Sequence, residues 1–284
     1  MHTLVTGCRG RISSALVTLL RRDGHTVRAA SRTPEGLAAT AAVLPADVPV
    51  VACDLSDPAT FGAALDGVDS VFLYAEPSGI DAFIAAAEAA GVGHIVLLSS
   101  NSVLAPDPRQ NPIAAAHHTV EQALIASPVT ATLLRPGMFA TNAHQWADSV
   151  RAHGSVDLPY PDSHGSPIDS DDIAEAALAV LTDPGLQGVA YHLTGPESLT
   201  AAEQVGLLAA AAGRPIAVNP VAPEDWKKAM SAHLPEPIID GLLAYTAATV
   251  GVPADVTDDI ERLTGHPART FAAWAEKHAT AFRS

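Results

Sequence analysis

The chain has 284 residues, of which 48% are hydrophobic, and its formal net charge at pH 7 is -15. So much apolar sequence can bury a sizeable core and argues against disorder, and the length suggests a main domain with a smaller appendage. The acidic excess, without any basic run, excludes nucleic acids and anionic membranes as partners. No apolar stretch reaches the roughly eighteen residues of a membrane span and no basic leader precedes the first strand pattern, so we expect a soluble, cytoplasmic protein.

Short apolar runs alternate with amphipathic or Ala-rich segments from the start of the chain. The runs that we predict as strands are HTLVTG, TVRAAS, VPVVAC, SVFLYA, HIVLLSS, VTATLLRP and AYHLTGP. Continuous apolar runs are typical of strands that are covered on both faces. After a first helix that Gly24 closes, further helices are predicted over 34–44, 57–66, 79–90, 111–126, 142–152 and 171–182. Right-handed crossovers convert this order into a parallel sheet layered by helices, so the predicted fold class is α/β with a doubly wound parallel sheet.

The pattern changes after about residue 195, where helical segments dominate and only RPIAVNPV reads as a short strand. We therefore expect a nucleotide-binding domain over 1–154, completed by 171–195. A smaller, mostly helical substrate-binding cap is expected over 155–170 and 196–284.

The opening loop, TGCRGRISSAL, has small residues where a dinucleotide-binding turn needs glycines. Gly7 allows a sharp turn, Gly10 allows close approach of a phosphate, and Ser13 stands where the third glycine would pack a helix against a strand. Because the loop follows a strand and opens a helix, its backbone amides and the helix dipole would form an anion site. The alternative is a Gly-rich turn without a ligand.

The residues after the second and third strands bear on which dinucleotide binds. Ser31 and Arg32 stand where an NAD-specific site carries an acidic residue, and a guanidinium suits a 2'-phosphate instead. Arg9 and Arg11 add positive charge nearby, so NADP(H) is the expected cofactor. Asp54, at the end of the third strand, either accepts from the adenine amino group or caps the helix that starts near Pro58.

Several segments together resemble the NmrA-like, atypical branch of the short-chain dehydrogenase/reductase superfamily. They are LVTGCRGRISSALVTLLRRDGHTVRAASR, VEQALIASPVTATLLRPGMFATN, PIDSDDIAEAALAVLTDP with YHLTGPESLT, and ERLTGHPARTFAAWAEKHATAF, and they occur in order along almost the whole chain. The resemblance implies a Rossmann-type fold that binds NADP(H), with a small-molecule substrate held between the sheet edge and the cap. A homodimer is one assembly that it allows.

The resemblance also implies which positions contact the cofactor. The phosphate loop matches at Gly7, Arg9, Gly10, Arg11 and Ile12, the 2'-phosphate contact at Arg32 beside Ser31, and the adenine contact at Asp54 and Leu55. Further matches lie beside the ribose, at the end of the fifth strand, and in the loop near the nicotinamide: Ala75, Glu76, Ser99, Ser100, Pro136, Met138 and Phe139.

The chain departs from the superfamily at the catalytic helix. Ordinary members carry Tyr-x-x-x-Lys there, in which the tyrosine delivers a proton to the substrate carbonyl. Alignment through Glu121 puts Ile113 at the tyrosine position and His117 at the lysine position. Isoleucine has no proton to give, so we name His117, with Ser100 and Asn101 as hydrogen-bonding groups, as the catalytic candidates. A partly exposed surface histidine is the alternative for His117.

Other aromatic and histidine side chains are candidates for the substrate site. Phe139 and Trp146 suit an apolar wall, and Tyr160 and His164 would stand at the cap entrance. Tyr74, on the ribose side, is a weaker candidate for a proton donor.

Hydrolase and metalloenzyme motifs are absent from the sequence, and Cys8 and Cys53, two strands apart, suit neither a disulfide nor a metal site. The leading interpretation is an NADPH-dependent reductase of a small apolar quinone or carbonyl, because a hydroquinone oxyanion needs less help from an acid than an alkoxide. The alternatives are a non-catalytic NADP(H)-sensing regulator and a repurposed cyclase or isomerase that does not use hydride transfer.

Overall fold

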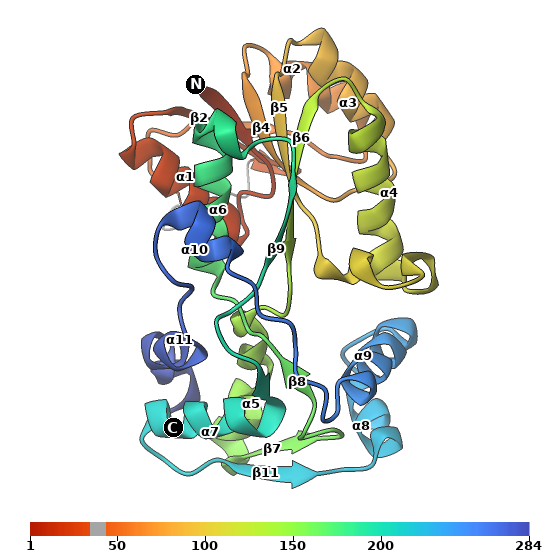
Figure 1. Cartoon of the computed structure of the whole chain (residues 1–284), viewed down its shortest axis with the longest axis vertical. Coiled ribbons are helices and arrows are strands. Elements are labelled where there is room, and N and C mark those ends of the chain that lie inside the picture. Colours follow the sequence, from red (N-terminus) through yellow and green to blue (C-terminus); the bar gives the residue numbers. More distant parts are fainter. Residues whose placement is uncertain (35–43, 284) are drawn as a thin grey trace. The chain divides into compact units, whose positions relative to one another are not determined.

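A seven-stranded parallel sheet organises the first part of this computed structural model, which describes residues 1–34 and 44–283 (Figure 1). Its strand order is β3-β2-β1-β4-β5-β6-β9, and every neighbouring pair is parallel. The strands are β1 (His2–Val5), β2 (Thr26–Ser31), β3 (Val50–Ala52), β4 (Ser70–Tyr74), β5 (His94–Leu98), β6 (Thr130–Pro136) and β9 (Ala190–Leu193). The strand order reverses between β1 and β4, as in doubly wound nucleotide-binding sheets, so the predicted Rossmann-type α/β fold is confirmed.

Helices cover both faces of this sheet. Figure 1 shows α1 and α6 on one face, with α10 beside α6, and α2, α3 and α4 on the other. The bounds are α1 (Arg11–Arg22), α2 (Phe61–Leu65), α3 (Ile80–Ala89), α4 (Pro112–Ala126), α6 (Ser170–Thr182) and α10 (Asp259–Thr264). Between the elements lie the short 3-10 helices η2 (Pro58–Thr60), η3 (Asn101–Leu104), η4 (Pro108–Gln110) and η6 (Pro184–Leu186). The helix predicted over 34–44 falls largely on residues outside the described part.

Local sequence explains where α4 begins. The side-chain oxygen of Asn111 accepts from the backbone N–H groups of Ile113 and Ala114, and Pro112 occupies the first helical position, where its missing N–H costs nothing. Beneath the helices, apolar side chains fill the space against the sheet. Phe61 and Phe83, for example, meet edge to face with ring centroids 5.1 Å apart.

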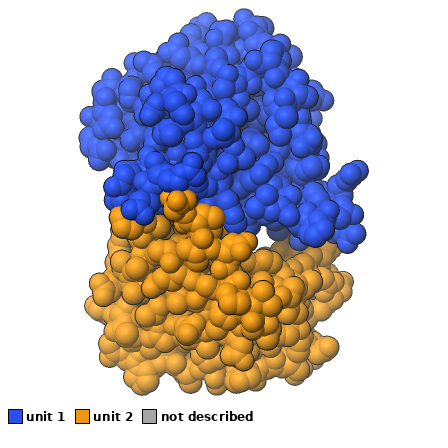
Figure 2. All heavy atoms as spheres, viewed as in Figure 1, with its two compact units in different colours: residues 1–136, 170–193, 259–266 blue, residues 137–169, 194–258, 267–284 orange. Residues whose placement is uncertain are grey.

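The chain divides into two compact units (Figure 2). The first comprises residues 1–136, 170–193 and 259–266, and the second comprises 137–169, 194–258 and 267–284. The second unit contains η5 (Ala140–Trp146), α5 (Ala147–His153), β7 (Ser155–Leu158), β8 (His164–Gly165), β10 (Leu199–Thr200), α7 (Ala201–Ala212), β11 (Ala217–Pro220), α8 (Pro223–Met230), α9 (Glu236–Ala248), α11 (Phe271–Lys277) and η7 (Ala279–Phe282).

These limits differ from the expected domain boundary after residue 154 for physical reasons. Ala143 and Val150, on η5 and α5, are buried in the same hydrophobic cluster as Trp274 of α11, so this segment packs with the second unit. In the opposite direction, the Asp259 carboxylate at the start of α10 accepts a hydrogen bond from the backbone N–H of His192 on β9 at 2.8 Å, which ties this short helix to the first unit.

Among the described residues, no helix is both long enough and apolar enough to cross a membrane.

One buried histidine couples this fold to pH. His94, on β5, is 5% exposed, and its Nε2 lies 2.8 Å from the Thr132 hydroxyl on β6. Burial lowers the pKa of His94 from 6.5 to about 4. Between these values the unfolded chain binds a proton that the folded protein does not accept, so this group makes the folded state less stable as the pH falls from 6.5 toward 4.

We predict that His94→Gln weakens this acid sensitivity. Between pH 7 and pH 4.5 the free energy of unfolding should fall by about 2 to 3 kcal/mol less in the variant than in the parent, as measured by urea unfolding at each pH. His233→Gln, at an exposed position between α8 and α9, should leave the pH dependence unchanged. A His94→Gln curve parallel to that of the parent would contradict the assignment.

Candidate functional site

A cavity of about 370 Å³ lies in the first unit at the carboxyl ends of β1 to β4. It straddles the point where the strand order reverses, which is where ligands bind in open α/β sheets. Eight predicted cofactor-binding residues line it: Gly7, Arg9, Ser31, Arg32, Asp54, Leu55, Ala75 and Glu76. Six others complete the wall: Thr6, Cys8, Thr33, Cys53, Ser56 and Tyr74.

The loop between β1 and α1 has the features that a phosphate group requires. Gly7 adopts a φ of +62°, which an L side chain would strain, and the N–H of Gly10 donates to the Gly7 carbonyl at 2.8 Å to close the turn. Within the described part of the chain, no side chain caps the N-terminus of α1 and no acidic residue stands in its first turn. The first turn of the helix therefore supplies amide donors and the positive end of the helix dipole, without a capping side chain or an acidic residue of its own, and these groups fit a pyrophosphate.

The third position of the loop pattern shows why serine is accepted there. Ser13 is fully buried, and its hydroxyl donates to the Thr6 carbonyl at 2.8 Å. The helix thus packs closely against the end of β1 through a hydrogen bond in place of a bare glycine.

Positive charge gathers at the end of β2. The Nη2 of Arg9 donates to the Thr33 carbonyl at 2.9 Å and to its hydroxyl at 3.0 Å, which fixes this guanidinium beside the cavity. Arg32 is exposed, and no residue from Ser31 to Thr33 carries a carboxylate. The arrangement fits an additional phosphate on the ribose better than a bare diol.

Asp54 is not a helix cap. Its carboxylate accepts from the backbone N–H of Ser56 at 3.0 Å and from the Ser56 hydroxyl at 2.7 Å, while Asp57 caps the following turn by accepting from the N–H of Ala59. The Ser56 hydrogen bonds, with attraction from Arg32, hold the pKa of Asp54 below its usual value. Asp54 therefore stands in the cavity wall as an anionic acceptor.

The two cysteines of the wall are free and buried. Burial raises the pKa of Cys53 to about 11, and it raises the pKa of Cys8 as well. Both groups stay as neutral thiols at ordinary pH, so they fill space in the cavity wall and do not act as nucleophiles.

The catalytic candidates lie outside this cavity wall, on and before α4. Ile113, at the tyrosine position, is 45% exposed. His117 is half-buried, and its Nδ1 has no hydrogen-bond partner among the described residues. Burial lowers the pKa of His117, while the negative charge of Glu121, one helical turn away, acts in the opposite direction. Burial prevails, so the imidazole is neutral near pH 7.

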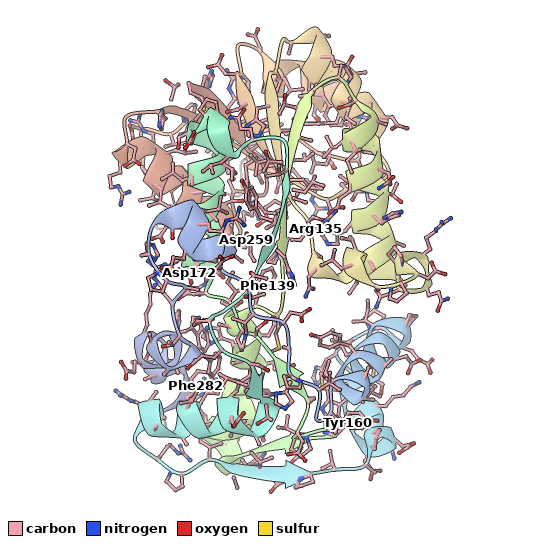
Figure 3. All side chains as sticks on the ribbon, in the orientation of Figure 1. Arg135, Phe139, Tyr160, Asp172, Asp259 and Phe282 are labelled. Carbon is pink, nitrogen blue, oxygen red and sulfur yellow. The ribbon has the colours of Figure 1, made fainter. Side chains whose placement is uncertain are left out.

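A buried network joins α4 to the ends of β5 and β6. Glu121 is 1% exposed, and it accepts from the Ser99 hydroxyl at 2.5 Å and from Nε and Nη2 of Arg135 at 2.9 and 2.6 Å. Arg135 lies on β6 (Figure 3). The guanidinium of Arg135 thus faces the carboxylate of Glu121 through two hydrogen bonds, and the Ser99 hydroxyl gives its hydrogen to the same carboxylate. Sequence analysis did not identify Arg135, because neither its spacing nor its neighbours show that it faces α4.

The remaining hydroxyl and amide candidates stand in the short turn after β5. Ser100 caps η3, since its side-chain oxygen accepts from the Ser102 N–H at 3.2 Å, and Asn101 is the first residue of that turn. Both are half-buried. The structure thus brings His117, Ser100 and Asn101 into the first unit without placing them in the cavity wall.

The predicted substrate residues Phe139, Trp146, Tyr160 and His164 belong to the second unit, and so does Met138. Trp146 packs against the hydrophobic core of that unit, and Nδ1 of His164 lies 3.2 Å from the Ser198 hydroxyl. Figure 3 labels Phe139 and Tyr160. None of these residues lines the described cavity.

Comparison with known proteins agrees with this geometry. A family described as NAD(P)H-binding matches residues 7–184. The chain is 36% identical to a (4-alkanoyl-5-oxo-2,5-dihydrofuran-3-yl)methyl phosphate reductase of Streptomyces griseus and 37% identical to an NAD(P)H azoreductase of Xenophilus azovorans, over 98% of each chain in both cases. An NADPH-dependent quinone oxidoreductase of Escherichia coli superposes with a TM-score of 0.82 at 26% identity, over 97% of this chain and 99% of the other.

These findings confirm the predicted nicotinamide dinucleotide cofactor at the level of the family. The co-occurrence of the loop, the sheet and full-length relatives also confirms the resemblance drawn from the sequence. The chain belongs to the NAD(P)H-binding family and, within it, to the NmrA-like, atypical branch of the short-chain dehydrogenase/reductase superfamily.

Proposed function

We propose that this protein is an NADPH-dependent reductase of small, largely apolar quinones or related conjugated acceptors. The observation that carries the proposal is the cavity at the switch point, with an uncapped helix terminus on one side and Arg32 on the other. Full-length relatives named as reductases favour catalysis over a purely regulatory role or a reaction without hydride transfer.

The residues of the first unit divide the work of holding the cofactor. The amides of the first turn of α1 would hold the pyrophosphate, Arg32 beside the fixed Arg9 would hold the 2'-phosphate, and Asp54 would accept from the adenine amino group. When bound, the nicotinamide supplies a hydride.

The side chains near α4 favour an acceptor that needs little acid catalysis. Ile113 cannot protonate a developing alkoxide, and His117 is neutral near pH 7 because burial lowers its pKa. A quinone avoids this difficulty, since the hydroquinone oxyanion is far less basic and water or a transiently protonated His117 suffices. The Glu121–Arg135 pair holds α4 against β6, so that His117 keeps a fixed place beside the sheet edge.

The proposed function predicts turnover of NADPH with a quinone. The purified protein should oxidise NADPH in the presence of a simple benzoquinone or naphthoquinone, followed at 340 nm, and should reduce an azo dye more slowly or not at all. His117→Gln should retain quinone reduction within about threefold at pH 8, where the histidine is neutral, and lose more of it below pH 6. Absence of turnover across quinones, azo dyes and carbonyls, with NADPH binding intact, would overturn the proposed function.

The proposed function also predicts which cofactor the protein prefers. Arg32→Ala should raise the Kd of NADPH about tenfold or more and that of NADH less than about twofold, as measured by calorimetry, because only NADPH carries the 2'-phosphate. Arg109→Ala, the same loss of charge at an exposed position on η4, should leave both values unchanged. An Arg32→Ala protein with unaltered NADPH affinity would show that the 2'-phosphate lies elsewhere.

A further inference from the structure

The phosphate loop rests directly on the side chain of Tyr74, the last residue of β4. A Cβ atom placed on Gly7 would lie 2.8 and 2.9 Å from the Cε2 and Cδ2 ring carbons of Tyr74. A Cβ atom on Gly10 would lie 3.0 Å from the tyrosine hydroxyl oxygen. The tyrosine beneath the loop therefore leaves no room for a side chain at Gly7 and makes a tight contact with one at Gly10, independently of any phosphate.

Hydrogen bonds hold the tyrosine in this place. Its backbone N–H donates to the Thr6 hydroxyl at 3.0 Å, and its ring meets that of Phe72 edge to face with centroids 6.0 Å apart. Its own hydroxyl interacts with the Ser13 side chain. Because the Ser13 hydroxyl donates its one hydrogen to the Thr6 carbonyl at 2.8 Å, only the Ser13 oxygen is left to accept from Tyr74. Burial raises the pKa of Tyr74, which keeps the phenol protonated as this donor requires.

Serine at the third loop position thus has a partner that glycine would not offer. Tyr74, Ser13 and Thr6 form one connected unit that joins β4, α1 and β1 beneath the loop, and Tyr74 also lines the cavity. A ring that fills the space under the loop excludes water there and removes alternative loop conformations before a ligand arrives.

We propose that Tyr74 is a positioning residue for the pyrophosphate site, which acts with Ser13 to hold the loop from Gly7 to Gly10 in its ligand-ready conformation. This inference deepens the proposed function, on whose cofactor site it rests. Its effect should be confined to ligands that contain the pyrophosphate.

Calorimetry on the full chain with two probes tests this directly. NADPH contains the pyrophosphate, whereas 2'-AMP contains only adenine, ribose and the 2'-phosphate. Tyr74→Phe, which keeps the ring and removes the hydroxyl, should raise the Kd of NADPH about three- to tenfold and change that of 2'-AMP less than about twofold. Tyr245→Phe, at a 47% exposed position on α9, is the matched control and should change neither.

A double-mutant cycle supplies the second readout. Ser13→Ala should weaken NADPH binding to a similar degree, and Tyr74→Phe combined with Ser13→Ala should be no weaker than the poorer single variant, because both substitutions remove one hydrogen bond. Additive effects, an equal loss for NADPH and 2'-AMP, or unaltered NADPH binding by Tyr74→Phe would each overturn the inference. These measurements need no turnover, so a parent protein that binds NADPH but reduces nothing would refute the proposed function and leave this inference standing.

Discussion

The first turn of α1 is the constraint on which the rest of this account depends. In the described part of the chain, α1 starts with no side-chain cap and no acidic residue in its first turn, in a protein whose net charge is -15. Such a terminus favours an anion, and the parallel sheet places it at the reversal of strand order between β1 and β4. The fold thus creates the site, and the basic residues near β2 decide which anionic ligand suits it.

Different contacts hold the loop after β1 and the helix α4 in place at the carboxyl edge of the sheet. On the cofactor side, Tyr74 and Ser13 support the loop from below, and Arg9 is held by Thr33. On the side of α4, the charge pair of Glu121 and Arg135 performs the equivalent task. Burying a charged pair of this kind costs desolvation energy, and the cost is substantial here because Glu121 is almost completely buried. In exchange, the pair fixes the position of α4 relative to β6.

The strands of the sheet could be predicted from the sequence because they are buried on both faces and therefore form continuous apolar runs. VFLY and IVLL, in β4 and β5, are examples in which burial and β propensity agree. The division into two units was harder to predict from the sequence. The short helix α10 belongs with the sheet because Asp259 accepts a hydrogen bond from β9, and no local sequence pattern reveals a contact between residues so far apart in the chain. A hydrogen bond between two single polar groups that are far apart in the chain leaves no periodic pattern in the sequence.

The same difference separates the predicted from the missed site residues. Gly7, Arg32 and Asp54 follow strands at positions that topology alone brings to one edge, and all three line the cavity. Thr33 and Arg135 act through side-chain contacts to residues 24 and 14 positions away, which only the folded structure shows. Asp54 could equally have been a helix cap, and the choice needed the Ser56 contacts.

The central claim is that backbone amides at the start of α1 receive the cofactor's phosphates. Amide NMR of the ¹⁵N-labelled protein during titration with NADPH measures this at the atoms concerned. The account predicts saturable downfield shifts of the Arg11 and Ile12 amides, as expected for N–H groups that begin to donate to phosphate oxygens. Saturable NADPH binding that leaves these amides unshifted, or no binding at all, would contradict it.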